Sequence, residues 1–160
     1  MPLIPLAGSQ MLATVDDSDY EMIIAKHWRY DRGRATHFFR DPIEHKRRGV
    51  MMHRLLLAAP SGLVVDHIDH DQLNNRRCNL RLCTQRENAR NVRGMKHRKS
   101  RFKGVVLDTR RGKYGAYITV DGRGRFLGYY IDEEDAGRAY DAGALKYFGE
   151  FAYLNFGTGA

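Results

Sequence analysis

Residues 64–80, VVDHIDHDQLNNRRCNL, hold three aspartates, two histidines and three asparagines in a run that is too polar to bury itself. The stretches on either side, LVVDH and LRLCT, are apolar and have the residue pattern of short strands. The next stretch, TQRENARN, begins with Thr84 and carries Glu87 three residues later, which is the pattern of a capping box that opens a helix. The sequence therefore predicts a strand, a polar loop, a second strand and a helix, in that order.

The size and composition allow one domain or two small ones, since the chain has 160 residues and 42% hydrophobic content. No apolar run approaches the roughly 20 residues that a membrane-spanning helix needs. The start, MPLIPLAGSQ, lacks the basic region and the long apolar stretch of a signal peptide. Two cysteines in a polar segment, Cys78 and Cys83, are expected to stay reduced. We therefore expect a cytoplasmic protein.

The positive charge is concentrated in one part of the chain. The formal net charge is +8, and the stretch from Arg76 to Arg125 holds 16 of the 27 lysines and arginines against three acids, a net of +13. A solvated basic surface would also have this composition. So dense a stretch nevertheless favours a polyanion as partner, and nucleic acid is the expected one.

The N-terminal part has mixed patterns. SDYE, at residues 18–21, has the form of a capping box, and helical spacing then continues from Tyr20 to Trp28. ATHFFR, at residues 35–40, predicts a strand, and MMHRLLLAAPSG predicts a short helix that ends at Pro60. A basic segment, residues 94–100, has no apolar pattern and is predicted to be a linker.

The C-terminal part returns to strand patterns. FKGVVLD, KYGAYITVD and GRFLGYYI are short, rich in β-branched and aromatic residues, and separated by turns that contain glycine, which predicts a three-stranded antiparallel meander. Asp132 is predicted to cap a following helix whose buried face carries small residues such as Ala136 and Gly143, so that it can lie close to the sheet. The expected architecture is α+β, with domains at residues 1–93 and 101–160.

The polar run offers the groups that phosphodiester hydrolysis needs. A neutral histidine can take a proton from water, and Mg²⁺ binds carboxylate and amide oxygens while keeping several of its waters. Asp66 and His67 are adjacent at the end of a predicted strand, so a kink or a strand end is expected there. Asn88 lies one turn inside the following helix, from which the folded chain could bring it back to Asp66.

The order DH at residues 66–67, NL at 79–80 and EN at 87–88 resembles the ββα-metal motif of HNH nucleases, in the version of phage and intron homing endonucleases. The resemblance spans about residues 50–93, with the motif at about 63–93. It implies that His67 is the general base, that Asp66 and Asn88 hold one Mg²⁺ or another divalent cation such as Mn²⁺, and that Asn79 braces the loop orienting His67. It also suggests a bacterial or phage-infected cell as the setting.

Other polar residues of the run have simpler explanations. Turn formation, through side-chain to backbone hydrogen bonds, is the favoured interpretation of four of them. A surface position or a supporting position beside the site is expected for three histidines. Zinc binding is disfavoured, because the two cysteines have no matching second pair. The four turn formers are Asp69, Asp71, Asn74 and Asn75, and the three histidines are His53, His70 and His97.

The C-terminal part resembles the plant ethylene-response-factor DNA-binding domain over about residues 101–156, most strongly from RAYD to LNF. The resemblance implies a three-stranded sheet that enters a DNA groove, with a helix behind it. Val106, Asp108 and Thr119 replace arginines of that family, so its target sequence does not transfer. The residues at or near the family's DNA-contacting positions are Lys103, Arg110, Arg111, Lys113, Tyr114, Tyr117, Arg123, Arg125 and Phe126. For Tyr117 and Phe126, ordinary sheet packing is an equal alternative.

The sequence thus predicts a metal-dependent endonuclease of the HNH type that acts on double-stranded DNA. The alternatives are a non-enzymatic DNA-binding regulator on a decayed nuclease scaffold and an RNA-binding protein. Whether the chain is a monomer that nicks or a homodimer that cuts both strands is left open, as is the target sequence.

Overall fold

A computed structural model describes residues 1–92 and 100–157, and its internal contacts divide the chain into two compact units, Met1–Gln85 and Arg86–Ala160. The domain limits expected from the sequence, 1–93 and 101–160, stay a prediction. Most of the expected linker, 94–100, lies outside the described residues. Within the described part of the chain, helices are too short or too polar to cross a membrane. The mixture of helices and sheets agrees with the predicted α+β class.

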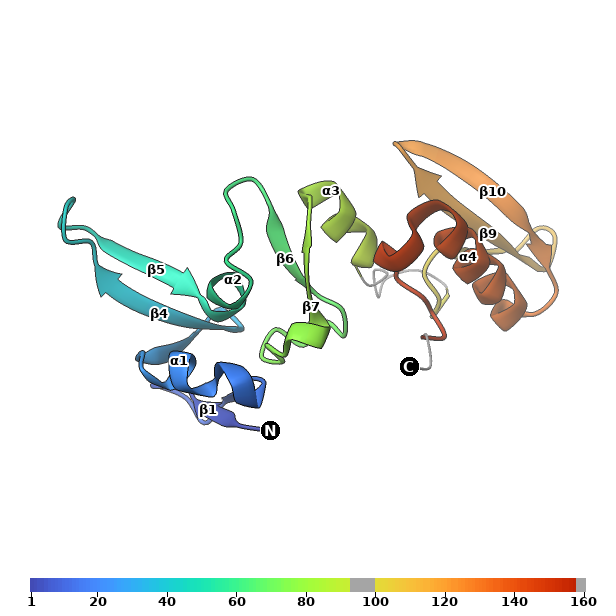
Figure 1. Ribbon diagram of the computed structural model, residues 1–160. Helices are drawn as coiled ribbons and strands as arrows, with labels where there is room; N and C mark the ends of the chain where they lie inside the picture. Colours follow the sequence, from blue (N-terminus) through green and yellow to red (C-terminus); the bar gives the residue numbers. More distant parts are fainter. Residues whose placement is uncertain (93–99, 158–160) are drawn as a thin grey trace. The chain divides into compact units, whose positions relative to one another are not determined.

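The first unit is built from three small antiparallel sheets and two short helices (Figure 1). The sheets pair β1 with β2, β3 with β4 and β5 in that order, and β6 with β7. The elements are β1 (Leu3–Pro5), β2 (Leu12–Thr14), the 3-10 turn η1 (Asp17–Asp19), α1 (Tyr20–Ile24), β3 (Trp28–Asp31), β4 (Arg34–Arg40), β5 (Arg47–Met51), α2 (Met52–Leu56), β6 (Val64–His67), the 3-10 turn η2 (Arg77–Asn79) and β7 (Leu80–Cys83).

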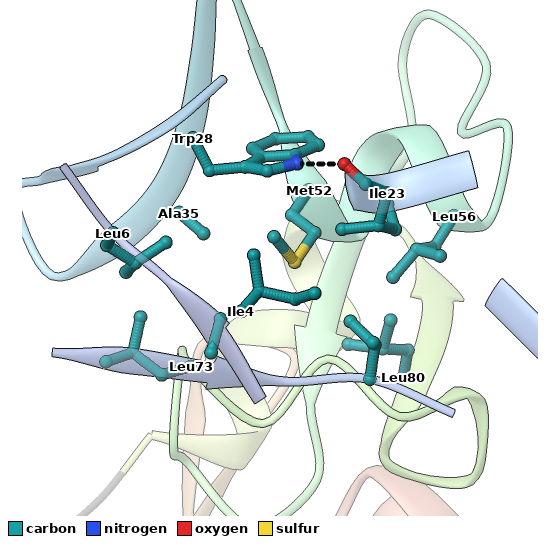
Figure 2. Packing of buried hydrophobic residues seen from close by; sticks show 11 residues of the cluster. Ile4, Leu6, Ile23, Trp28, Ala35, Met52, Leu56, Leu73 and Leu80 are labelled. Carbon is teal, nitrogen blue, oxygen red and sulfur yellow. Dashed lines mark hydrogen bonds between the residues drawn. The ribbon is translucent and has the colours of Figure 1, made fainter. Parts of the chain in front are cut away.

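One apolar cluster joins these elements. Figure 2 shows Ile4 of β1, Ile23 of α1, Trp28 of β3 and Met52 of α2 in the same cluster, and all four are buried. The indole Nε1 of Trp28 donates a hydrogen bond of 2.7 Å to the carbonyl of Ile23, which satisfies the ring nitrogen in an apolar setting. Leu80 of β7 belongs to the same cluster, so the core also anchors the β6–β7 hairpin.

The structure corrects the N-terminal predictions in two places. The helical spacing expected to reach Trp28 is wrong beyond Ile24, because α1 ends there and Trp28 begins a strand that pairs with β4. The capping box expected at residues 18–21 is also not formed, since Asp19 is the N-cap of α1 and makes no side-chain capping bond. Asp19 instead accepts two hydrogen bonds of 2.8 Å from the guanidinium of Arg77. Strand β5 was not predicted.

The second unit contains the predicted antiparallel meander, in the order β10–β9–β8. The pairing aligns Val105 with Ala116 and Tyr117 with Phe126, and a bulge follows Phe126. Helix α3 (Gln85–Asn88) crosses the boundary between the units and continues into a 3-10 turn. The remaining elements are η3 (Ala89–Asn91), β8 (Val105–Asp108), β9 (Lys113–Val120), β10 (Arg123–Tyr130), α4 (Glu133–Phe148) and η4 (Gly149–Phe151).

Helix α4 packs closely on one face of this sheet (Figure 1). As predicted, Asp132 caps the helix, and its Oδ1 accepts a bond of 2.6 Å from the Glu134 amide. Small residues allow the close approach, since a Cβ at Gly143 would lie 3.0 Å from the Leu127 side chain. Gly104 is more demanding: its φ is +76°, and a Cβ there would lie 2.0 Å from the Tyr140 ring. A larger residue at either position would push helix and sheet apart.

Candidate active site

Asp66 and His67 are the last two residues of β6, so the strand ends where the sequence predicted a kink or a strand end. Across the hairpin Asp66 is opposite Arg81, and His67 is opposite Leu80. The carbonyl of His67 accepts a hydrogen bond of 3.0 Å from the amide of His70, which has a positive φ of 67°. The chain therefore turns sharply after His67, and both Asp66 and His67 remain buried in the first unit.

Asn79 ties together the loop that follows His67. Its Nδ2 donates hydrogen bonds of 2.8 Å to the Asp69 carboxylate and to the Asn74 carbonyl. Its Oδ1 accepts a bond of 3.0 Å from the Asp69 amide. Asp69 in turn accepts from the Asp71 amide at 2.8 Å, as a turn former does. These bonds fix the loop at both ends, which is the arrangement that the predicted bracing role of Asn79 requires.

His67 lies in an environment that favours its neutral form. Burial lowers the pKa of His67 below its usual value of 6.5, although the polar side chain of Asn75 and the carboxylates of Asp69 and Asp66 act in the opposite direction. The ring of His53, from α2, lies edge-on to it with 5.0 Å between ring centroids. His53 is itself 5% exposed, and burial lowers its pKa to about 3. His53 thus occupies a supporting position beside His67 and not the surface.

Sequence reasoning missed the partner of Asp66. Arg81 donates two hydrogen bonds to Oδ2 of Asp66, from Nε at 2.9 Å and from Nη2 at 2.6 Å. The pair is nearly enclosed, with side-chain exposures of 11% for Arg81 and 8% for Asp66. Residues directly opposite on paired strands are neighbours. The pairing of LVVDH with LRLCT could therefore have predicted this contact, had their register been considered.

The expected metal ligands lie in different units. Asp66 belongs to the first unit, whereas Asn88 follows the boundary between Gln85 and Arg86, so its approach to Asp66 stays a prediction. Among residues 1–92 and 100–157, histidine, cysteine, aspartate and glutamate side chains do not gather in threes as a metal cluster would require. The chemistry of the expected pair still fits Mg²⁺, because one carboxylate and one amide oxygen suffice for an ion that keeps several waters.

In the second unit, two of the nine expected DNA-binding residues meet on the sheet face that points away from α4. Ala116 and Ile118 of β9 are buried in the clusters formed with the helix, so Tyr117 between them points to the opposite face. Phe126 is directly opposite Tyr117 on β10, and their ring centroids lie 5.2 Å apart. Arg110, Lys113 and Arg123 are exposed at or near the turns, as is Arg111.

Three other residues of the expected DNA-binding set contact residues within the second unit. Tyr114 packs against the core cluster beneath α4. The guanidinium of Arg125 lies 5.2 Å from the centroid of the Tyr147 ring of α4. Lys103 donates from Nζ to the carbonyls of Arg90 and Val92 at 3.0 and 2.6 Å, and burial lowers its pKa to about 8. DNA contact for all nine residues stays a prediction.

Comparison with known proteins agrees with the motif. Residues 58–90 match the HNH endonuclease family, and this segment includes Asp66, His67, Asn79 and Asn88. An uncharacterized HNH endonuclease of Acanthamoeba polyphaga mimivirus is 33% identical over 120 residues, which is 71% of this chain and 62% of that relative. The chain thus spans less than two thirds of the length of this relative.

Plant transcription factors match a smaller part of the chain. An AP2-like ethylene-responsive transcription factor of Arabidopsis thaliana is 41% identical over 69 residues, 37% of this chain and 23% of the plant protein. An AP2/ERF and B3 domain-containing protein of Oryza sativa subsp. japonica is 47% identical over 57 residues, 36% of this chain and 15% of the rice protein.

These matches confirm both resemblances drawn from the sequence. The chain is a mixed helix-and-sheet protein in which residues 58–90 match the HNH endonuclease family. Over part of its length it is also similar to AP2/ERF proteins.

Proposed function

We propose that this chain is a metal-dependent DNA endonuclease that hydrolyses phosphodiester bonds. The observation that carries the proposal is the pair Asp66–His67, buried side by side at the end of β6 within the segment that matches the HNH endonuclease family. His67 acts as the general base, and Asp66 with Asn88 holds one divalent cation, Mg²⁺ or Mn²⁺. Double-stranded DNA is the substrate.

His67 takes a proton from the attacking water. The step needs a neutral imidazole, and burial favours this form because it lowers the pKa of His67. Asn79 has an indirect positioning role, since its hydrogen bonds hold the loop that follows His67.

Asp66 and Asn88 supply the oxygens that would hold the cation. When bound, a divalent cation stabilises the negative charge that grows on the phosphate and on the leaving oxygen. Arg81 orients the buried carboxylate of Asp66 through its two hydrogen bonds to Oδ2. By resemblance, the products are a 5′-phosphate and a 3′-hydroxyl. A single site per chain cuts one strand, so a monomer nicks and a homodimer can break both.

A nicking assay tests the proposal. Supercoiled plasmid is incubated with Mg²⁺ and with the wild-type chain, His67→Ala or Asn88→Ala, and the relaxed form is measured on a gel. The exposed histidine His27, changed to alanine, is the matched control. The wild type and His27→Ala should nick, whereas loss of a general base should slow nicking by about 100-fold or more. Equal nicking by all four chains would contradict the assignment.

A second candidate function is a DNA-binding regulator without nuclease activity. The observation that favours it is the Asp66–Arg81 pair, because a guanidinium already supplies positive charge to the carboxylate that would hold the metal. In that case the wild type would bind duplex DNA and leave the plasmid supercoiled at every Mg²⁺ and Mn²⁺ concentration.

A further inference from the structure

Three aromatic side chains form a continuous exposed group on the sheet of the second unit. Tyr117, Phe126 and Tyr129 are 40%, 53% and 38% exposed. The ring of Phe126 lies between the other two, with centroid distances of 5.2 Å to Tyr117 and 4.8 Å to Tyr129. We call these three residues the aromatic face. Because α4 packs on the residues that alternate with Tyr117, the aromatic face lies on the opposite side of the sheet.

The backbone beneath the rings is shaped for them. A Cβ at Gly115 would lie 2.7 Å from the Tyr117 ring, so the ring rests against the strand where a side chain is missing. Tyr129 lies opposite Gly115 in the register of β9 and β10. The rings therefore rest on paired strands and are held in place before any ligand arrives.

Polar contacts fix the edge of the aromatic face. Arg111 donates from Nη1 to Oδ2 of Asp108 at 2.7 Å, and the Tyr129 hydroxyl lies 3.4 Å from the same oxygen. The guanidinium of Arg111 lies 5.2 Å from the centroid of the Tyr129 ring. Lys113, the register partner of Asp108, is exposed beside this edge. A basic rim thus borders an apolar stacking surface, the combination that binds an anionic chain carrying planar bases.

The chemistry of this face suits unpaired bases better than a closed duplex. Inside a duplex the flat faces of the bases are covered by their neighbours, and only their edges are offered in the grooves. Side chains that read those edges are mainly arginine, lysine, asparagine and glutamine, whereas this face presents the exposed rings of Tyr117, Phe126 and Tyr129. Aromatic rings gain most by stacking on bases that have left the helix.

We propose that the aromatic face binds unpaired bases, so that the second unit directs the chain to DNA that is locally open. Phe126 stacks on a base, Tyr117 and Tyr129 support it on either side, and the rim cations Arg111 and Lys113 hold the neighbouring phosphates. This inference rests on the DNA-binding part of the proposed function, and it adds that the bound DNA is locally unpaired.

The test compares three DNA ligands that share one sequence: a closed duplex, a duplex with an internal bubble, and the single strand. Fluorescence anisotropy measures their dissociation constants with the full chain carrying His67→Ala, so that cleavage does not interfere. Binding should be tighter to the bubble and to the single strand than to the closed duplex. Phe126→Ala should weaken bubble binding by about 10-fold, the order expected for one lost stack, and closed-duplex binding by less than about 2-fold.

Two further variants separate stacking from other effects. Phe126→Trp keeps a stacking ring and should retain the preference for the bubble. Phe39→Ala removes a ring of similar exposure, 42%, from the first unit and should change neither affinity. Equal affinity for bubble and closed duplex, or an equal loss on both after Phe126→Ala, would overturn the inference. Plasmid nicking by the wild type reports the nuclease proposal separately, so a preference for open DNA without nicking would refute only the nuclease.

Discussion

Each unit holds an arginine–aspartate pair at its candidate functional surface, and the two pairs differ mainly in burial. Arg81 and Asp66 lie 2.6 Å apart with side-chain exposures of 11% and 8%. Arg111 and Asp108 lie 2.7 Å apart with exposures of 61% and 22%. The two pairs thus have similar geometry but contribute differently to stability. Water screens the attraction within the exposed pair, whereas the attraction within the buried pair must compensate for the hydration that both ions lost.

The comparison also separates two ways of building a surface for DNA. At the candidate active site, burial protects the reacting groups and favours a neutral His67. On the sheet of the second unit, the aromatic face and its rim cations Arg111 and Lys113 stay exposed to water, where a cation keeps its charge and an aromatic ring keeps its face open. A buried arrangement thus suits the catalytic step, and an exposed arrangement suits the binding of DNA.

The largest expected effect comes from breaking the buried pair. Arg81→Leu should lower the free energy of unfolding of the first unit by about 3 kcal/mol, because Asp66 would remain as a buried charge without its arginine. Trp28, the one tryptophan of the sequence, is buried in the first unit, so its fluorescence in a guanidinium titration reports this unit. Changing Asp66 to leucine as well should recover part of the loss. An unchanged midpoint for Arg81→Leu would show that burial does not make this pair more important for stability than the exposed pair.

A smaller effect is expected from mild acid, within about one pH unit below 6.5. The pKa of His53 is about 3 in the folded chain and near 6.5 when exposed, so below pH 6.5 the unfolded chain takes up a proton that the folded chain does not. Above pH 6.5 the protonation of His53 therefore does not change the free energy of unfolding. As the pH drops from 6.5 toward 3, the protonation of His53 lowers this free energy by about 1.4 kcal/mol for each pH unit.

Trp28 fluorescence at a series of pH values measures this dependence. His53→Gln should flatten it, and the exposed histidine variant His45→Gln should retain it. If His53→Gln is as sensitive to acid as the wild type, another group must carry the effect.

The smallest effect is expected at the exposed pair. Arg111→Ala should leave the thermal midpoint of the second unit almost unchanged, since its partner Asp108 can return to water. Asp108→Ala should cost more, because Oδ1 of Asp108 also accepts the amides of Arg110 and Arg111 and so holds the turn after β8. Circular dichroism of the full chain compares the two variants. A loss for Arg111→Ala that matches the loss for Arg81→Leu would contradict the role given to burial.

Much of the second unit was predictable, because its elements follow one another along the chain. Three strands separated by glycine-containing turns can pair with their neighbours in sequence, and Asp132 caps the helix that follows. The faces of the strands follow from alternation, but the contacts of Lys103 and Arg125 do not, since each depends on residues from other elements.

The first unit was less predictable. β4 and β5 make most of a sheet that the sequence suggested only in part, and Trp28 changed from a helix position to a strand. The pairs that matter for the candidate site, His53 with His67 and Arg81 with Asp66, join residues 14 and 15 positions apart. No local pattern specifies such contacts, because they depend on the strand register and on the packing of α2.

By itself, the sequence determined the residue types and their order: a carboxylate next to an imidazole at a strand end, a bracing asparagine, and a basic, aromatic C-terminal part. These features depend on neighbouring residues, and local propensities are strong enough to specify them. Only the tertiary structure decided which of these groups are buried, which arginine pairs with which aspartate, and which rings stay open to solvent. Burial is a property of the whole fold, because a side chain leaves water only when distant segments close over it.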